Sequence, residues 1–282
     1  MTLLAIPNVS EGRDQAAIDQ IADAFDARLL DVHSDTDHHR SVFTLAGEPG
    51  ELANAVADGA AEVVRQVDLR AHEGIHPRVG AIDVAPIVYL DPADRGAACA
   101  EALVLGDLLG DELKLPVFLY GELAPDRTRA GLRRGGPAAL ADRIESGELR
   151  PDFGPRRLHP TAGAVLVAAR PPLVAFNVEL APPATLEDAR SIAARIREAG
   201  PEGLESVRAI GLWLAARDVA QVSINVEDHR ATALAKVVEA IARHARPRQA
   251  ELVGLAPRAA FDGFPNDLPV ANRRTVEDAL EE

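Results

Sequence analysis

Hydrophobic residues in the first third of the chain follow two patterns, short continuous runs and runs spaced by three or four positions. Leu3 to Val9 is a short apolar run broken by a Pro-Asn pair, which predicts a buried strand followed by a turn. Helical spacing of apolar residues predicts two amphipathic helices, one from Ala16 to Phe25 and one from Leu52 to Val67. The order is β-α-β-β-α-β, the split βαβ arrangement of ferredoxin-like folds. Its other strands are predicted at residues 28–33, 41–46 and 81–90.

The second half of the chain repeats this order of elements, although no sequence identity between the halves is evident. Its strands are predicted at residues 173–180, 207–213, 220–226 and 251–255, and its helices at 186–198 and 231–245. The tail from Ala256 is expected to be loosely attached, with a short helix near Val276.

A connecting stretch separates the two halves. It is predicted to contain a helix at residues 94–113, a strand at 115–120, and a helical stretch at 127–148 with a Gly/Pro break. Residues 149–172 are rich in Pro, Gly and Arg and form the longest segment predicted to be irregular. Long irregular loops inside compact proteins are usually functional or disordered.

These patterns predict an α+β protein made of two ferredoxin-like α/β-sandwich subdomains, residues 1–170 and 171–282. A chain of 282 residues exceeds the usual size of one domain, which agrees with this division. Loops from both halves are expected to converge on a ligand groove between the subdomains.

Charge and cysteine content narrow the classes of function. The chain has 44 acidic against 30 basic residues, a formal net charge of −14, and so lacks the basic footprint of nucleic-acid binding. A single cysteine, Cys99, allows no internal disulfide, and the absence of a leader pattern or long apolar run predicts a cytosolic protein. A small anionic substrate remains compatible if arginines gather locally. The arginines in Gly/Pro-rich or polar loops are Arg40, Arg78, Arg156, Arg157 and Arg170.

Residues 72–80, with the sequence HEGIHPRVG, support two interpretations. The first five letters match the H-E-x-x-H pattern of zinc hydrolases, which needs both histidines on one face of a helix. Gly74 weakens a helix by about 1 kcal/mol relative to Ala, and Pro77 drives His76 toward extended geometry. We therefore favour the second interpretation, a loop that presents the titratable imidazole of His76 beside the fixed cation of Arg78.

Two polar loops earlier in the chain are further candidates. Residues 7–12 (PNVSEG) lie at a strand-to-helix junction, where Ser10 could cap the helix or backbone N–H groups could hold a carboxylate. Residues 31–40 (DVHSDTDHHR) contain three acids, three histidines and an arginine. This second loop is either an exposed polar loop or a segment that orients a catalytic group, and we prefer the latter.

Residues 151–164 (PDFGPRRLHPTAGA) are the last candidate loop. Their prolines and glycines fix an open backbone that a flat ring could approach closely, and the alternative is an interdomain linker. The chain contains no G-x-S-x-G, G-x-G-x-x-G or Walker pattern in a suitable context, so serine-hydrolase chemistry and nucleotide cofactors have no support.

Seven collinear segments, spanning about residues 6 to 257, together resemble the glutamate formimidoyltransferase family, the transferase portion of formimidoyltransferase-cyclodeaminase. The segments are IPNVSEG (6–12), DLRAHEGIHPRVGAID (68–83), PVFLYG (116–121), PDFGPRRLHPTAG (151–163), AFNV (175–178), QVSIN (221–225) and ELVGLAP (251–257).

The resemblance implies transfer of a formimidoyl group from N-formimidoyl-L-glutamate to N5 of tetrahydrofolate, in histidine breakdown and one-carbon metabolism. It implies tetrahydrofolate as co-substrate, no metal, and a cytoplasmic homodimer. The family's catalytic histidine falls on His76, and we predict donor contacts from Arg78, Arg40, Asn8 and Asp35. The family's folate-binding loop falls on Gly154, Pro155, Arg156, Arg157, Leu158, His159, Pro160, Thr161, Ala162 and Gly163.

One departure from the family concerns His33, because animal-type members have an acid at this position. Asp35 or Asp37 is then expected to orient or charge the site, and His72 to be a supporting or surface residue. The chain ends soon after the last segment, so a cyclodeaminase domain is not expected. Three alternatives stay open: formyl transfer from N-formylglutamate, a zinc-dependent hydrolase using HEGIH, and a folate-binding protein without catalysis.

Overall fold

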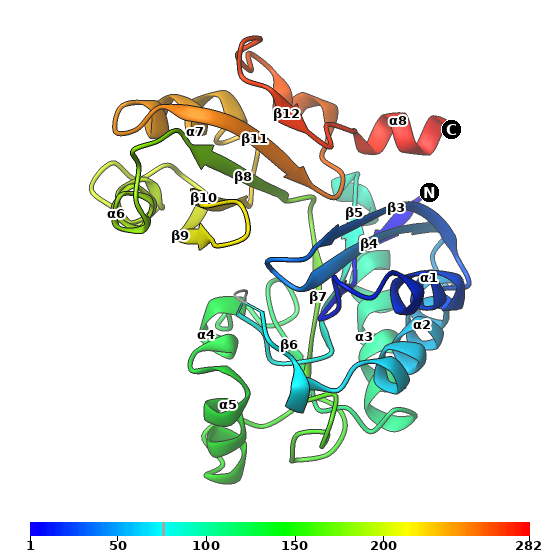
Figure 1. Ribbon diagram of the computed structural model, residues 1–282. Helices are drawn as coiled ribbons and strands as arrows, with labels where there is room; N and C mark the ends of the chain where they lie inside the picture. Colours follow the sequence, from blue (N-terminus) through cyan, green and yellow to red (C-terminus); the bar gives the residue numbers. More distant parts are fainter. Residues whose placement is uncertain (75–76) are drawn as a thin grey trace. The chain divides into compact units, whose positions relative to one another are not determined.

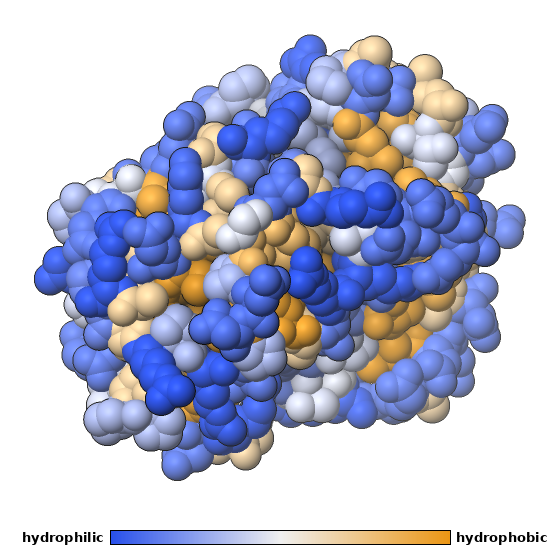
Figure 2. Space-filling model, turned by 90° about the horizontal axis from the view of Figure 1, so that it is seen from above, coloured by the Kyte–Doolittle hydropathy of each residue, from blue (hydrophilic) through white to orange (hydrophobic). Residues whose placement is uncertain are grey.

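The chain forms two compact units, Met1–Pro171 and Pro172–Glu282, in the computed structural model shown in Figure 1. The structure describes residues 1–74 and 77–282. In the space-filling view of Figure 2, hydrophilic side chains dominate the visible face, as expected for a chain in which 26% of the residues are charged. Among the described residues, no helix combines the length and the apolar character that crossing a membrane requires.

One mixed sheet forms the centre of the first unit. The predicted first strand is split at Ile6-Pro7 into β1 and β2, and both pieces pair antiparallel with β4 and β5. The sheet therefore runs from β3 through β4 and the β1/β2 position to β5, which is the ferredoxin-like order. The elements are β1 (Leu3–Ala5), β2 (Asn8–Val9), α1 (Gln15–Ala24), β3 (Arg28–Asp35), β4 (Arg40–Gly47), α2 (Leu52–Gln66) and β5 (Ile82–Tyr89).

Two parallel strands extend this sheet beyond β5. β7 pairs parallel with β5, and β6 pairs parallel with β7. The prediction that residues 149–172 are irregular is wrong for β7, because its apolar run is a parallel strand buried on both faces, which has no alternation to reveal it. The connecting elements are α3 (Arg95–Asp111), β6 (Val117–Leu119), α4 (Arg129–Arg133), α5 (Gly136–Glu145) and β7 (Val165–Arg170).

Helices cover the two faces of this sheet unequally. α1, α2 and α3 pack on one face over a core that includes Phe43, Leu45 and Ile87. α4 and α5 cover the opposite face only near β6 and β7, where Leu132 and Leu140 join a separate apolar cluster.

The second unit repeats the β-α-β-β-α-β order, and the predicted α+β fold of two ferredoxin-like subdomains is confirmed. Its antiparallel strands lie in the order β11, β8, β10, β9, equivalent to β5, β1, β4, β3 of the first unit. The last strand begins at Pro247, earlier than the predicted 251–255. The elements are β8 (Val174–Leu180), α6 (Leu186–Ile196), β9 (Val207–Leu214), β10 (Val219–Val226), α7 (Leu234–Ala242) and β11 (Pro247–Val253).

The tail is packed against the second unit, so the expectation of loose attachment is wrong. β12 (Val270–Ala271) pairs parallel with β11, and the predicted short helix is α8 (Val276–Glu281). Phe261 and Phe264 are buried in the unit's core, and the Phe264 ring meets Phe176 edge-on with 5.9 Å between centroids. Glycines and prolines in the tail mark turns between packed residues.

Candidate active site

Hydrogen bonds between residues far apart in the sequence join the candidate loops of the first unit. The hydroxyl of Ser10 donates to the Gly80 carbonyl at 2.8 Å, and the Ser10 N–H donates to the Ala81 carbonyl at 2.7 Å. The interpretation that Ser10 caps the first helix is therefore wrong. The cap is Asp14, whose carboxylate accepts from the first N–H groups of the helix. Ser10 instead anchors the 72–80 segment to the end of β2.

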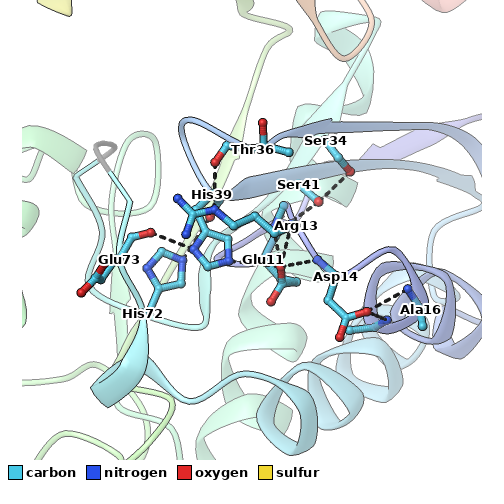
Figure 3. Close-up of polar contacts among 12 residues, drawn as sticks. Glu11, Arg13, Asp14, Ala16, Ser34, Thr36, His39, Ser41, His72 and Glu73 are labelled. Atoms are coloured by element: carbon cyan, nitrogen blue, oxygen red, sulfur yellow. Dashed lines mark hydrogen bonds and ion pairs between the residues drawn. The ribbon is translucent and has the colours of Figure 1, made fainter. Parts of the chain in front are cut away.

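Glu11 closes the turn that follows β2 (Figure 3). Its Oε1 accepts hydrogen bonds from the backbone N–H groups of Gly12, Arg13 and Asp14 at 2.9, 2.7 and 3.0 Å. Burial alone raises the pKa of Glu11, but these N–H groups and His39 outweigh it and lower the pKa below the usual 4.5. The N–H groups that could have held a substrate carboxylate are thus already used by the chain's own carboxylate.

His39 connects Glu11 to the segment that contains the H-E-x-x-H letters (Figure 3). Its Nδ1 lies 2.8 Å from the Glu73 carbonyl oxygen, and its Nε2 lies 3.1 Å from Glu11 Oε1. Both neighbours are acceptors while Glu11 is ionised, so both bonds form only when the ring has two N–H groups. His39 thus ties two loops together.

His72 stacks on His39 and is held as a neutral ring. The two centroids are 4.0 Å apart with 14° between planes, and His72 Nε2 donates to the His39 carbonyl at 3.1 Å. Burial, followed by the charges of Arg78 and His39, lowers the pKa of His72 to about 4. His72 Nδ1 is buried without a hydrogen-bond partner among the described residues. The structure thus places His72 in a supporting position between two loops.

The 31–40 loop is not an exposed polar loop, which was one of its two interpretations. His33 and His38 are 8% and 4% exposed, and His38 Nδ1 lies 3.0 Å from Asp35 Oδ1. The turn is further fixed by Ser41, whose hydroxyl donates to the Glu11 carbonyl at 2.6 Å. His39 itself has a positive φ of 50°, which lets the ring turn toward the 72–74 segment.

The proposed catalytic histidine, His76, lies outside the described residues. The part of the H-E-x-x-H pattern that is described, residues 72–74, forms no helix and follows a 3₁₀ turn at Leu69–Ala71, as the breakers Gly74 and Pro77 predict. Within residues 1–74 and 77–282, no group of three or more His, Cys, Asp or Glu side chains is arranged to hold a metal ion.

The predicted donor-binding residues occupy different parts of one region. Arg78 donates to the carbonyls of Gly74 at 3.0 Å and His72 at 2.8 Å, so it also braces its own loop. Arg40 begins β4 opposite Asp35 of β3. Asn8 uses its side-chain N–H to bond the Ile6 carbonyl at 3.0 Å, which supports the turn between β1 and β2.

Sequence reasoning missed two charged residues of this region. Asp83 is 1% exposed and forms an ion pair with Arg133 of α4. An acid inside the otherwise apolar run 81–90 is a signal that could have identified Asp83, because carboxylates are rarely buried without a partner. Nothing in the sequence around Arg133 marks it, since its partner is distant along the chain.

The 154–163 segment lies against Leu69 and against residues 79–81. The Leu69 N–H donates to the Thr161 carbonyl at 2.9 Å, and the Ala81 N–H donates to the Ala162 carbonyl at 2.8 Å. His159 closes the turn, with Nδ1 accepting the Ala162 N–H at 3.0 Å, and burial lowers its pKa. Arg156 and Arg157 are exposed. The structure therefore brings the predicted folate loop next to the predicted catalytic loop.

The glycines of this loop serve packing within the chain rather than an open surface. Gly154 and Gly163 have φ values of +77° and +70°. A Cβ added at Gly163 would lie 2.3 Å from the Val79 carbonyl oxygen, and one at Gly154 would lie 2.1 Å from the Leu115 carbonyl oxygen. The idea that these two glycines clear space for a flat ring is therefore wrong, because the space is filled by backbone.

Comparison with known proteins gives a consistent result along the chain. Residues 2–170 match a family model described as the N-terminal subdomain of the formiminotransferase domain, and residues 175–262 match the formiminotransferase domain model. The chain is 38% identical over 275 residues to rat formimidoyltransferase-cyclodeaminase, covering 91% of this chain and 50% of that protein.

Shorter relatives match over most of their length. Glutamate formimidoyltransferase of Streptococcus pyogenes serotype M1 is 36% identical over 268 residues, which cover 91% of this chain and 89% of the relative. The enzyme of the same name from Thermoplasma acidophilum is 34% identical over 270 residues, covering 91% and 88%. The chain spans about half the length of the cyclodeaminase-containing relatives that it matches.

Proposed function

The chain belongs to the formiminotransferase domain family, and on that premise we propose that it is a glutamate formimidoyltransferase. The reaction moves the formimidoyl group of N-formimidoyl-L-glutamate to N5 of tetrahydrofolate. The observation that supports it most is the 36% identity that covers 89% of a relative named for this activity.

The hydrogen bonding within the first unit also supports the proposal. Three of the segments that resemble the family, 6–12, 68–83 and 151–163, meet within the first unit: Ser10 bonds Gly80 and Ala81, and residues 79–81 bond Ala162 and Ala164. A transfer between two bound molecules needs their binding loops side by side, because alignment of the reactants supplies up to roughly 7–11 kcal/mol of the acceleration. Loops tied to one another by backbone bonds hold such an alignment.

In the proposed mechanism, His76 acts as acid and base in turn. It accepts the proton released as N5 of the folate attacks the formimidoyl carbon, and it returns a proton to the glutamate nitrogen as the C–N bond breaks. One imidazole can serve both steps because the tetrahedral intermediate lies between them. An unperturbed imidazole, with a pKa of about 6.5, is suited to both roles near neutral pH.

Arg78 and Arg40 are proposed to hold the donor's carboxylates, and Gly154 to Gly163 to form the folate-binding loop. Guanidinium groups bind carboxylates through paired N–H···O bonds, which orient as well as attract. Tetrahydrofolate is the co-substrate in this proposal, and the acting form is a homodimer, which sedimentation equilibrium of the purified chain would test.

The direct test is an assay of the purified chain with formimidoylglutamate and tetrahydrofolate. Appearance of 5-formimidoyl-tetrahydrofolate in proportion to enzyme supports the proposal, and binding of folate without turnover contradicts it. N-formylglutamate belongs in a parallel reaction, because faster transfer from that donor would replace the formimidoyl substrate by the formyl one.

The role of His76 is tested by His76→Ala. Turnover is expected to fall at least about 100-fold, because no group remains to move the proton, while tetrahydrofolate affinity stays within a few fold. His244→Ala is the control, since His244 lies in the second unit and pairs with Glu202 at 2.9 Å. Turnover of the His76 variant near that of the control would remove His76 from the mechanism.

A further inference from the structure

Asp83 is the buried centre of a group of arginine side chains in the first unit. It is the extra residue of a β-bulge, because β2 pairs with Val84 and Ile82 on either side of it. Bulges turn a side chain out of the regular alternation of a strand and often occur beside active sites. The Asp83 carboxylate accepts the Val79 N–H at 2.7 Å, and the side chain is 2% exposed. Its position is therefore fixed by the backbone.

Guanidinium groups from three separate elements lie around this carboxylate. Arg133 of α4 forms a buried ion pair with Asp83. Arg40 begins β4, which is separated from β5 by β2 alone, so about 10 Å lies between the two backbones, a span that an arginine can bridge. Arg78 lies in the loop before β5, and its charge interacts with that of Asp83.

The electrostatics of Arg40 show how much positive charge is gathered here. Burial first, then repulsion from Arg133 and Arg129, lowers the pKa of Arg40 to about 10, although Asp83 and Asp35 oppose the change. A second anion brought beside these groups would be attracted to several guanidinium groups in a partly water-excluded place, where Coulomb interactions are stronger than in water.

The short helix that supplies Arg133 is held by a clamp from the next helix. Arg143 of α5 donates to the carbonyls of Gly131 at 3.1 Å and Leu132 at 2.6 Å. The Gly131 carbonyl also accepts the Arg134 N–H at 3.4 Å, and the bonds from Arg143 add to it at the last turn and fix the end of α4. Arg129 lies one turn before Arg133 on the same side of α4. The clamp therefore positions two guanidinium groups together.

We propose that this arginine cluster, Arg40, Arg78, Arg129 and Arg133 around Asp83, binds both carboxylates of a short dicarboxylate, with Arg133 as a binding residue. The inference rests on the proposed function, which identifies that dicarboxylate as the glutamate-based donor. Asp83 holds the Arg133 guanidinium through an ion pair before the ligand arrives, and such preorganisation reduces the ordering cost of binding. Guanidinium groups on β4, on the 72–80 segment and on α4 stand at separate points, which suits two carboxylates better than one.

The test compares Arg133→Gln with Arg134→Gln, because Arg134 is the exposed next residue on the same turn. Binding of glutarate and N-acetyl-L-glutamate is measured by titration calorimetry, with N-acetyl-L-glutamine as the single-carboxylate comparison. The wild-type chain and Arg134→Gln are expected to bind the dicarboxylates alike and the glutamine derivative at least about 10-fold more weakly. Arg133→Gln is expected to lose roughly 10- to 100-fold in dicarboxylate affinity. Equal glutarate affinity in Arg133→Gln and the wild-type chain overturns the site.

A second variant guards against misfolding, since Arg133→Gln leaves a buried carboxylate without its ion-pair partner. In Asp83→Asn/Arg133→Gln both charges are removed, and the Asn oxygen still accepts the Val79 N–H. This variant is expected to melt close to the wild-type temperature and still to bind glutarate at least about 10-fold more weakly. Wild-type glutarate affinity in the double variant also overturns the site.

The two proposals fail in distinguishable ways. Glutarate binding that depends on Arg133, together with no formimidoyl transfer, keeps the dicarboxylate site and removes the proposed function. Formimidoyl transfer with an unchanged donor KM in the double variant keeps the proposed function and removes the site. Within an active enzyme, the loss is expected in donor KM, with kcat and the KM for tetrahydrofolate changed less than about 3-fold.

Discussion

At the scale of single residues, the stacked pair of His39 and His72 links protonation to the position of a loop. His39 needs two N–H groups for its bonds to Glu11 and Glu73, whereas His72 is neutral with its Nδ1 buried. Besides burial, the neighbouring Arg78 and His39 disfavour a charge on His72 and so lower its pKa. The stacked arrangement is therefore favoured while His72 is neutral.

This arrangement predicts a pH dependence of stability. The pKa of His72 is about 4 in the folded chain and near 6.5 when unfolded, so between these values the unfolded chain binds the extra proton. The stability that comes from a neutral His72 is complete above pH 6.5 and is lost as the pH falls toward 4. In His72→Gln, the free energy of unfolding from urea titrations is expected to fall less between pH 7.5 and 4.5 than in the wild-type chain.

The residual slope in that variant has identified sources. Burial also lowers the pKa values of His159 and His229, so both histidines reduce the free energy of unfolding as the pH falls. An unchanged slope in His72→Gln would show that His72 is already protonated in the folded chain at pH 4.5, contrary to the stacked, neutral arrangement.

At the scale of elements, the proposed site depends on the pairing of the 154–163 segment with Leu69 and with residues 79–81. Gly163 is central to it, because it bridges to Gly80 and its N–H and carbonyl both bond His159. Its positive φ and the nearby Val79 carbonyl leave no room for a side chain. A change at this glycine should therefore separate the two loops.

The variant Gly163→Ala tests this, with Gly147→Ala as the matched control. Gly147 has a φ of +77° and no atom within 4 Å of an added Cβ, so it reports the backbone strain alone, about 1 kcal/mol. Gly163→Ala is expected to lose about 3 kcal/mol of unfolding free energy, since the carbonyl must also move. Under the proposed function its KM for tetrahydrofolate rises as well. Equal losses in the two variants, measured in urea, would contradict the pairing argument.

The sequence predicted the order of elements well because hydrophobic spacing is a local property. Helices with one buried stripe, such as α1 and α2, and alternating strands were placed within a few residues. β7 was missed because a strand buried on both faces lacks alternation, and β11 was placed late because it begins with Pro247 among polar residues.

The site was only partly predictable, for the same physical reason. Loop composition identified the segments that meet, but not which groups would bond. The Arg133–Asp83 pair joins elements far apart in sequence, and the positive φ of His39 is not visible in its residue type. Partners of this kind depend on the tertiary fold, which no local pattern encodes.

At the scale of the whole molecule, two units share the order of their four ferredoxin-like strands but differ in the residues on their faces and loops. Each has its own apolar core, one around Phe43 and one around Phe176. The helix-free face of the second sheet is polar, with Asn177, Glu179 and Gln221 all less than 5% exposed. The fold fixes the order of strands, and the residues placed on its faces and loops decide what each unit can do.

The net charge of the chain predicts how salt changes its affinity for glutarate. A formal charge of −14 repels a dicarboxylate over long distances, whereas the arginine cluster around Asp83 attracts it at contact. The Debye length falls from about 30 Å at 0.01 M salt to about 10 Å at 0.1 M, so added salt removes the distant repulsion first and partly buried contacts last. Glutarate affinity is therefore expected to rise at least about 2-fold over this range, and to fall only at higher salt. Calorimetric titrations at fixed pH measure it, and a steady fall from the lowest salt would mean that the local arginine field dominates at every distance.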